Sequence, residues 1–367
     1  MWTTLSRTWR RALRPHAVKS PLTHGADGTV RTCCIGDFVT ENGDVIPDAH
    51  IAFETFGTLN AQGTNAILIE HALTGDSHVT AGASDTSGWW EDVVGPGKAI
   101  DTREFFVVCT NVLGGCNGST GPSTPVDDIE LGAAFPQVSI RDMVRAEALV
   151  ADALGIERFY AVVGGSLGGA RATEFAATQP HRVERTVVLA APAYSSADNI
   201  AWAHTQLQAI QLDPNYHGGN YAHHSVKPLY GLGLARQIAH LTYRSGDELD
   251  GRFGREHQPS MPGYYQVQSY LDYQAGKLVG RFDAQSYCVL TRALRDHDVR
   301  RGRSQLTVPG LHVVSLSSDR LYPPSQVKEL AGLAGAHSYT EVETDAGHDG
   351  FLTESAEVSK ILRSVLG

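Results

Sequence analysis

The sharpest chemical pattern in the chain is the segment Val163-Gly164-Gly165-Ser166-Leu167-Gly168-Gly169, which contains the spacing Gly-x-Ser-x-Gly. A strand-like run at 159–163 precedes it, and a helix-like run at 167–178 follows it. This context is typical of a tight strand-to-helix turn that presents a serine hydroxyl as a nucleophile. The backbone N–H of Leu167 would then point at a developing oxyanion. The strand and helix context disfavours the alternative, a glycine-rich turn with an ordinary surface serine.

A serine nucleophile needs a base and an acid, and candidates for both follow later in the chain. Asp319 comes shortly after the strand-like run Leu311-to-Leu316, and His348 lies in a loop after the next such run, Ser338-to-Val342. The chain order of serine, acid and histidine is one in which such triads occur. His348 would take the proton of Ser166, and Asp319 would orient the imidazole and stabilise its charged form. Because the chain holds 16 histidines, the position after the last strand is what singles out His348.

A second backbone N–H for the oxyanion is expected from a loop after an earlier strand. The segment His71-Ala72-Leu73-Thr74-Gly75 follows the strand candidate Ala66-to-His71, and Leu73 is the natural candidate by position.

The sequence signals for nucleotide binding and for metal binding are weaker than the signal for a serine nucleophile. The glycines near 114–118 complete no dinucleotide fingerprint and no Walker lysine is present. The pair His223-His224 has no obvious further ligand, so we predict no metal site.

The elements that must position these residues alternate between strands and helices. Such alternation predicts a mostly parallel central sheet with helices on both faces. Residues 29–191 and 301–367 are expected to form this core, and residues 192–300 to form a helical insertion. The helix-like runs of the insertion are Ala201-to-Gln211, Gly233-to-Leu241 and Val267-to-Val279. The remaining strand candidates are 45–55, 105–110 and 186–191, and the remaining helix candidates are 140–154, after the capping residue Ser139, and 324–333.

Composition excludes several classes of protein. The chain has 367 residues, 42% of them apolar, and a net charge of −10. An apolar content of this size predicts a folded chain, and no apolar run reaches the roughly 20 residues of a membrane helix. The acidic balance argues against a nucleic-acid or membrane-surface partner. Five cysteines, an odd number spread over a long chain, favour a reducing compartment, the cytoplasm.

The N-terminal extension, residues 1–28, departs from this average. Residues 1–24 carry five Lys or Arg side chains and no acid. We predict a loose solvated extension outside the folded core. A transit peptide or a surface anchor is the alternative.

The motifs taken together resemble the homoserine O-acetyltransferase family of the α/β-hydrolase superfamily, and most of all its actinobacterial members. The resemblance runs from about residue 34 to the C-terminus. Besides the serine turn, it rests on these segments: 70–76 (EHALTGD), Trp89-Trp90, 95–98 (GPGK), 110–122 (TNVLGGCNGSTGP), 139–142 (SIRD), 231–236 (GLGLAR), 269–274 (SYLDYQ), 281–284 (RFDA) and 347–349 (GHD). Two features depart from the family pattern: Leu167 stands where methionine is common, and the segment Val79-to-Gly88 is longer than typical.

The resemblance implies a ping-pong acyl transfer with no bound cofactor. Acetyl-CoA, as co-substrate, would acylate Ser166, and L-homoserine would accept the acyl group to give O-acetyl-L-homoserine for methionine synthesis. By the same resemblance, Arg236 binds the homoserine carboxylate, Asp349 its amino group, and Tyr243 lines the tunnel. The insertion would act as a lid and mediate a homodimer. Alternatives on the same fold are transfer of succinyl, transfer to serine or another alcohol, ester hydrolysis, and a non-catalytic binding protein.

Overall fold

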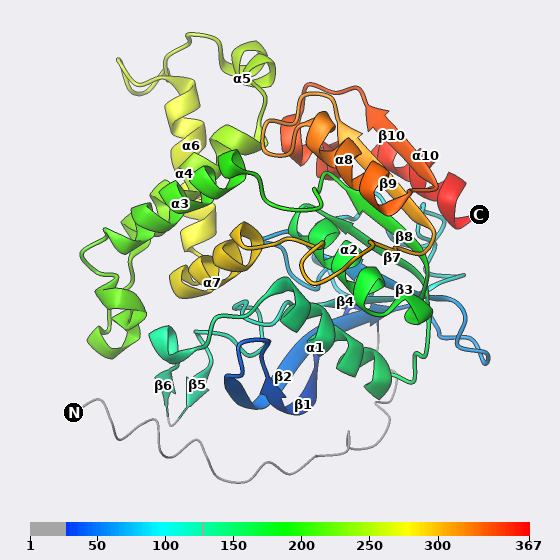
Figure 1. The fold of residues 1–367 in the computed structure, drawn as a ribbon. Helices are drawn as coiled ribbons and strands as arrows, with labels where there is room; N and C mark the ends of the chain where they lie inside the picture. The colour runs from blue at the N-terminus through cyan, green and yellow to red at the C-terminus, as the bar shows by residue number, and fades with distance from the viewer. Residues whose placement is uncertain (1–26, 127) are drawn as a thin grey trace.

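A central sheet of eight strands organises the molecule, in the order β1-β2-β4-β3-β7-β8-β9-β10 (Figure 1). The computed structural model describes residues 27–126 and 128–367. The pairs β1–β2 and β2–β4 are antiparallel, and every pair from β4 to β10 is parallel. The strands are β1 (Arg31–Val39), β2 (Val45–Phe56), β3 (Ala66–Glu70), β4 (Phe106–Thr110), β7 (Phe159–Gly165), β8 (Val183–Leu189), β9 (Leu311–Leu316) and β10 (Ser338–Val342). A separate hairpin joins β5 (Pro125–Val126) and β6 (Ile129–Glu130).

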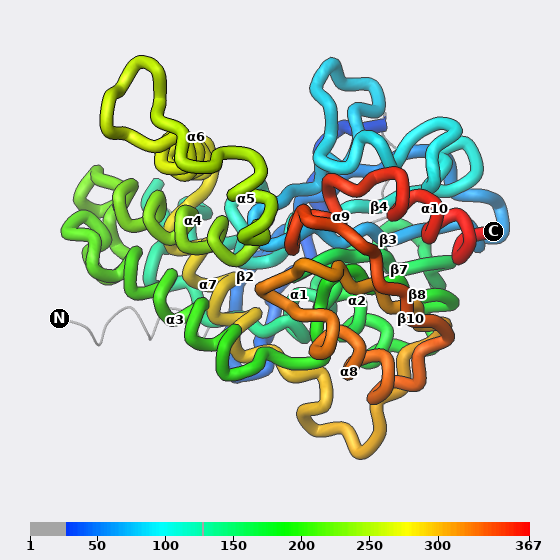
Figure 2. Tube along the Cα trace, turned by 90° about the horizontal axis from the view of Figure 1, so that it is seen from above, coloured from blue at the N-terminus to red at the C-terminus, as the bar shows by residue number. Residues whose placement is uncertain are grey.

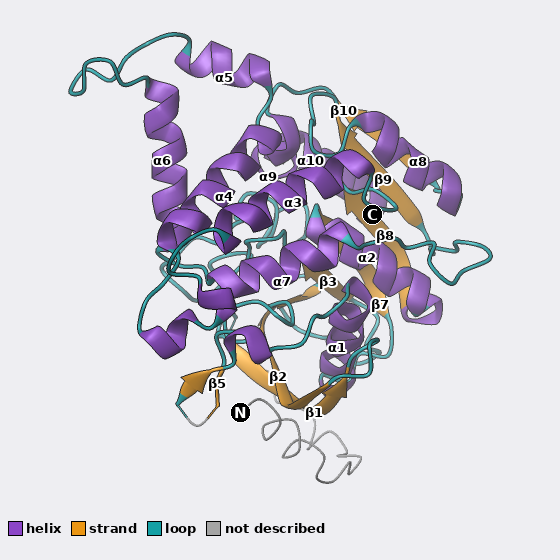
Figure 3. Ribbon diagram, turned by 60° about the vertical axis from the view of Figure 1, so that its left-hand side comes forward, coloured by secondary structure: helices purple, strands orange, loops and turns teal. Residues whose placement is uncertain are grey.

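Helices cover both faces of this sheet (Figure 3). On one face lie α1 (Ile140–Ala153), α2 (Leu167–Thr178) and α8 (Pro324–Ala334). On the other, α10 (Ser355–Leu366) packs together with the long segment 79–100. Neighbouring strand residues alternate between the two apolar clusters, Val162 in one and Val163 in the other, as the period of two along a strand requires.

The segment between β8 and β9 forms a helical insertion beside the sheet (Figure 2). Its helices are α3 (Ala197–Gln211), α4 (Leu229–Tyr243), α5 (Gly246–Phe253), α6 (Gln266–Val279) and α7 (Ala284–Arg295). Hydrogen bonds join it to loops after three strands: Arg236 to Thr74, Ser286 to Gly115 and Asn199 to Leu321. These loops follow β3, β4 and β9, so the insertion lies over the carboxyl edge of the parallel strands.

Several predicted elements match the structure to the residue, namely α2, β9 and β10. Other boundaries differ. The strand predicted at 159–163 continues to Gly165, because Gly164 and Gly165 pair with Val188 and Leu189 of β8. The helix predicted from Ala201 begins at Ala197, since Ser196 and Asn199 form a capping box there. The strand β1 and the helices α5, α7 and α10 were not predicted as separate elements.

The basic extension predicted at residues 1–28 lies outside the described residues except for its last two positions. Within residues 27–126 and 128–367, no helix is long and apolar enough to cross a membrane.

Candidate active site

Ser166 occupies the turn between β7 and α2 in a backbone conformation that is rare for a residue with a side chain. Its φ is 58° and its ψ is −124°. Its N–H donates to the carbonyl of Leu189 at 3.0 Å, and its carbonyl accepts from the N–H of Ala170 at 3.0 Å. A residue in a sparsely populated backbone region costs about 1–3 kcal/mol and persists only where its surroundings fix it. Both neighbouring elements therefore hold the serine in place.

Close backbone contacts explain the two glycines of the Gly-x-Ser-x-Gly pattern. A Cβ atom on Gly168 would lie 1.9 Å from the carbonyl oxygen of Glu70 in β3. A Cβ atom on Gly164 would lie 2.2 Å from the carbonyl oxygen of Gly168. Side chains at these two positions would push α2 away from β7 and β3. The serine turn consequently depends on bare backbone at both ends.

The three residues predicted as a triad form one hydrogen-bonded chain. The Nε2 atom of His348 lies 2.8 Å from the Oγ atom of Ser166, and its Nδ1 atom lies 2.7 Å from the Oδ2 atom of Asp319. The second oxygen of Asp319 accepts the N–H groups of Leu321 at 2.8 Å and Tyr322 at 2.9 Å. The carboxylate is thereby fixed in place, and its bond to Nδ1 leaves Nε2 free to receive the serine proton.

Aromatic rings surround the imidazole of His348. The ring centroids of Tyr322, Tyr243 and Phe351 lie 5.3, 5.6 and 5.7 Å from that of His348. Burial alone would lower the pKa of His348, but the charge and the hydrogen bond of Asp319 outweigh it and raise this pKa above its ordinary value. Burial also raises the pKa of Tyr243. The imidazole of His348 is therefore a stronger base than an ordinary histidine, and the phenol of Tyr243 beside it is neutral.

The two candidate oxyanion residues lie at the ends of neighbouring parallel strands. Glu70 in β3 pairs with Gly164 in β7, so Leu73 and Leu167 both follow the same edge of the sheet within a few residues. Leu167 is the first residue of α2, where a backbone N–H has no acceptor inside the helix. Both leucine side chains are buried. Their roles at an oxyanion remain a prediction.

The residues expected to bind the acceptor lie on α4 and beside the histidine. Nη1 of Arg236 lies 3.4 Å from Oγ1 of Thr74, and the guanidinium lies 5.6 Å from the ring centroid of Tyr243. The Nε atom of Arg236 is buried without a hydrogen-bond partner. Asp349 directly follows His348, and its carboxylate forms an ion pair with Arg244 at 3.2 Å. The structure thus brings Arg236, Tyr243 and Asp349 to the neighbourhood of His348.

A buried ionic cluster beneath the serine was not predicted from the sequence. Arg171 of α2 is fully buried and forms ion pairs with Glu70 of β3, at 2.7 Å, and with Glu147 of α1. It also lies 3.3 Å from the carbonyl oxygen of His71, in the loop that carries Leu73. The sequence held two signals of this cluster: Arg171 lies among small residues in a predicted helix, and Glu70 ends an apolar strand.

This cluster contains two carboxyl groups and one guanidinium. Burial raises the pKa of Glu70 well above its ordinary range; Arg171 opposes this effect, and the neighbouring Glu147 adds to it. Burial and Glu147 thus favour the protonated form of Glu70, and Arg171 stays charged between the two carboxyl groups. The cluster therefore joins α1, α2, β3 and the start of the 71–75 loop.

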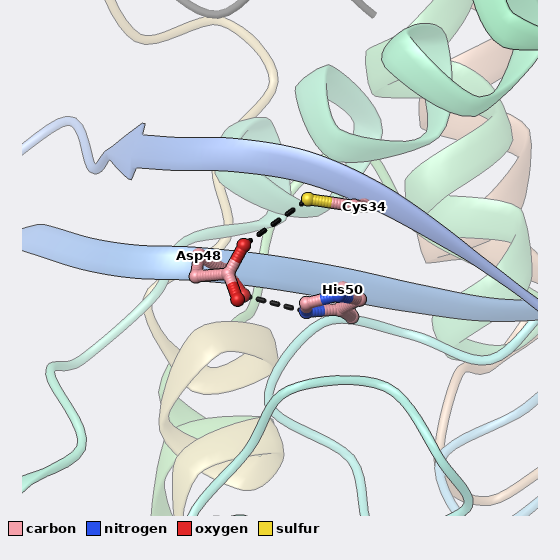
Figure 4. A group of neighbouring side chains, drawn as sticks. All are labelled: Cys34, Asp48 and His50. Carbon is pink, nitrogen blue, oxygen red and sulfur yellow. Dashed lines mark hydrogen bonds between the residues drawn. The ribbon is translucent and has the colours of Figure 1, made fainter. Parts of the chain in front are cut away.

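One group of side chains in the described part of the chain has the chemistry of metal ligands. Cys34, Asp48 and His50 lie on the antiparallel strands β1 and β2 (Figure 4). The thiol of Cys34 donates to the carboxylate of Asp48 at 3.2 Å, and Nδ1 of His50 lies 2.6 Å from the carbonyl oxygen of Asp48. The group is largely exposed, and none of its members belongs to the hydrogen-bonded chain of Ser166, so it has no place in the chemistry considered for that serine.

Comparisons with known proteins agree with this geometry. A family model described as alpha/beta hydrolase fold matches residues 65–355. The chain is 50% identical over 342 residues to the homoserine O-acetyltransferase of Thermobifida fusca, covering 89% of this chain and 90% of the relative. The crystal structure of homoserine O-acetyltransferase from Bacillus anthracis superposes with a TM-score of 0.85 at 27% identity, over 92% of this chain and 97% of that one. Esterase E22 superposes with a TM-score of 0.83 at 25% identity, over 92% and 100%.

The raised pKa of His348 leads to a prediction for the pH dependence of serine reactivity. His348 must be neutral to accept the proton of Ser166, so reactivity falls as the pH drops through a pKa above the ordinary 6.5. The rate of Ser166 modification by a fluorophosphonate probe, measured against pH, checks this. In Asp319→Asn the negative charge beside the imidazole is lost, so the pKa of His348 falls and the low-pH decline of the rate moves to lower pH. The rate itself falls by roughly 10⁴-fold. An acid limb that does not move in the variant would contradict the assignment.

The buried cluster predicts unequal effects of two neutralising substitutions. Arg171→Met leaves an uncompensated buried carboxylate and lowers the free energy of unfolding by roughly 3–5 kcal/mol. Glu70→Gln replaces a protonated acid by an amide of similar shape and costs less than about 1 kcal/mol. Urea denaturation of the two variants measures the difference. Equal losses would show that Glu70 is ionised.

Proposed function

The chain belongs to the homoserine O-acetyltransferase family of the alpha/beta-hydrolase fold and is an acyltransferase, and we propose that it transfers acetyl from acetyl-CoA to L-homoserine through Ser166. The observation that carries the proposal is the hydrogen-bonded chain from Ser166 through His348 to Asp319, flanked by Arg236 and Asp349. A nucleophile and its base are what acyl transfer needs, and a cation beside an anion is what an amino-acid acceptor needs.

In the first half-reaction, Oγ of Ser166 attacks the thioester carbonyl while Nε2 of His348 takes the serine proton. The new oxyanion is stabilised by the backbone N–H groups of Leu73 and Leu167. Collapse of the tetrahedral intermediate breaks the carbon–sulfur bond, and the departing CoA sulfur takes the proton from His348. An acetyl ester of Ser166 and a neutral imidazole remain.

In the second half-reaction, the homoserine hydroxyl replaces the thioester as the reacting group. His348 removes the hydroxyl proton as the oxygen attacks the acetyl ester. The second intermediate collapses to O-acetyl-L-homoserine, and Ser166 recovers its proton from His348. Water would compete with the acceptor, so the site must exclude it. The aromatic rings around His348 and the insertion over the sheet edge support that exclusion.

The environment of Arg236 supports recognition of a carboxylate. The planar guanidinium suits two parallel hydrogen bonds to a carboxylate. Within the described residues, Arg236 forms no ion pair, and its Nη1 atom lies 3.4 Å from the hydroxyl oxygen of Thr74. Asp349 offers the opposite charge for the ammonium group. A zwitterion with a hydroxyl is therefore the acceptor that these groups fit together.

Acetyl-CoA is the proposed co-substrate, and a cavity beside the site supports its entry. Leu73, Tyr243 and Tyr322 line this cavity together with Trp202, Gln206 and other residues of the insertion. Tyr243 and Tyr322 also pack on His348, so the cavity borders the catalytic histidine. We place the thioester arm of the acyl donor here.

We also propose a homodimer formed through the insertion. Tyr230, Leu234 and Leu241 lie four and seven residues apart along α4, and all three side chains are exposed. This spacing puts them on one face of the helix. Such an apolar face suits a second copy of the chain.

All five cysteines are free thiols, which supports the cytoplasm as the compartment.

The experiment that tests the function measures free CoA released from acetyl-CoA, with and without L-homoserine, in the wild type and in Ser166→Ala. We expect repeated turnover only with homoserine, at most one equivalent of CoA per enzyme without it, and no release in the variant. Release of the same rate without homoserine would indicate a hydrolase, as the similarity to esterase E22 allows. If CoA is released from succinyl-CoA and not from acetyl-CoA, the acyl donor is succinyl-CoA. If L-serine supports turnover and L-homoserine does not, the acceptor is L-serine.

Arg236→Ala is predicted to raise the KM for L-homoserine by about 10- to 100-fold, because the variant loses a charge-assisted bond to the carboxylate. The rate of CoA release in the first half-reaction stays the same, since the acetyl group makes no use of this cation. Steady-state kinetics with homoserine varied at saturating acetyl-CoA measures the effect. An unchanged KM would contradict the assignment of Arg236.

A further inference from the structure

Arg244, at the C-terminal end of α4, connects the insertion to the loop that carries His348. Its Nη2 atom lies 3.2 Å from Oδ2 of Asp349, and its Nη1 atom lies 3.4 Å from Oε1 of Glu248 in α5. The side chain of Arg244 is 15% exposed and that of Asp349 is 17% exposed. An ion pair this sheltered from solvent holds its geometry better than a surface pair does.

The backbone of the same loop is already fixed to α4 without the help of Arg244. Gly347 has a φ of +70°, and a Cβ atom there would lie 2.5 Å from the carbonyl oxygen of Tyr243. The hydroxyl of Ser245 donates to the carbonyl of Asp345 at 2.5 Å. These contacts position His348 independently of the ion pair. What Arg244 adds is the orientation of the Asp349 carboxylate.

The two arginines on this side of α4 differ in how their charges are balanced. Arg236, His240 and Arg244 follow one another at intervals of four residues and share one face of the helix. Burial, with both arginines adding, lowers the pKa of His240 to about 3, so His240 is neutral. In the described structure Arg244 has two carboxylate partners and Arg236 has none. An external carboxylate is therefore expected at Arg236 and not at Arg244.

One carboxylate oxygen of Asp349 is available as a hydrogen-bond acceptor. Its Oδ2 atom faces Arg244, while its Oδ1 atom accepts no hydrogen bond within the described residues. The guanidinium of Arg236 lies 5.6 Å from the ring centroid of Tyr243, and the ring of Tyr243 lies 5.6 Å from that of His348, the residue before Asp349. Without Arg244, the carboxylate could turn toward Arg236 and occupy the place of the substrate carboxylate.

We propose that Arg244 is a positioning residue that holds Asp349 by Oδ2, so that Oδ1 faces the ammonium group of the acceptor and Arg236 stays open for its carboxylate. This inference rests on the proposed transfer to an amino-acid alcohol. Arg244 then sets the preference for acceptors that carry an amino group, and it takes no part in acylation of Ser166.

The test separates the two half-reactions in Arg244→Gln and Arg244→Lys. The control is Arg252→Gln, because Arg252 also pairs with Glu248, at 3.6 Å, and lies against Tyr270, but has no contact with Asp349. In Arg244→Gln we expect the burst of CoA from acetyl-CoA to be unchanged and the KM for L-homoserine to rise about 10- to 100-fold. Arg244→Lys, which keeps a cation, recovers part of the loss, and Arg252→Gln behaves as the wild type.

Comparison of L-homoserine with 4-hydroxybutyrate, which lacks the amino group, gives a readout that a purely structural role would not move. In Arg244→Gln the preference for L-homoserine over 4-hydroxybutyrate falls at least about tenfold relative to the wild type. The proposal is overturned if this preference is retained, or if the CoA burst falls in parallel with the transfer rate. A wild type that forms no acyl-enzyme would instead overturn the proposed function, and this inference with it.

Discussion

The strained backbone of Ser166 is the constraint on which the rest of the structure depends. A φ of 58° with a Cβ atom present is unfavourable by itself, so the turn forms only if β7, α2 and β3 approach closely enough to fix it. Gly164 and Gly168 permit that approach, because any side chain there would overlap a backbone carbonyl. Arg171 lies one turn after Gly168 in α2, and its ion pair with Glu70 links this helix to the end of β3. Close packing, the two glycines and the buried charge of Arg171 therefore all help to fix the position of the Ser166 hydroxyl.

The proposed triad comes from one part of the chain, and the residues proposed to bind the acceptor come from two. Ser166, Asp319 and His348 all follow strands of the sheet, whose parallel register fixes where the strands end. Arg236 and Tyr243 lie on α4 of the insertion, and Arg244 directly follows the helix. The two parts meet at Gly347, where the backbone of the histidine loop touches the end of α4. On this account the core supplies the acylation chemistry and the carboxylate of Asp349, and the insertion adds Arg236, so both parts bear on which alcohol receives the acyl group.

Much of this arrangement could be predicted from the sequence because it depends on local patterns. The Gly-x-Ser-x-Gly spacing, the run before it and the helix after it are contiguous, and Asp319 and His348 follow strands with clear boundaries. The Arg171 cluster could not be predicted in this way, because its members come from β3, α1 and α2 and meet only in the folded chain. The same holds for Arg244 and Asp349, which are far apart in the sequence. Roles at the oxyanion and toward the acceptor still rest on position and family resemblance.

The central claim is that Ser166 carries the acyl group between the two substrates. Rapid mixing of the enzyme with acetyl-CoA in the absence of an acceptor, followed by intact-mass measurement and peptide mapping, tests it most directly. The account predicts one added acetyl group, located on the peptide that contains Ser166 and removed when L-homoserine is added. Product formation by an enzyme that never carries an acetyl group, or an acetyl group on another residue, would contradict it.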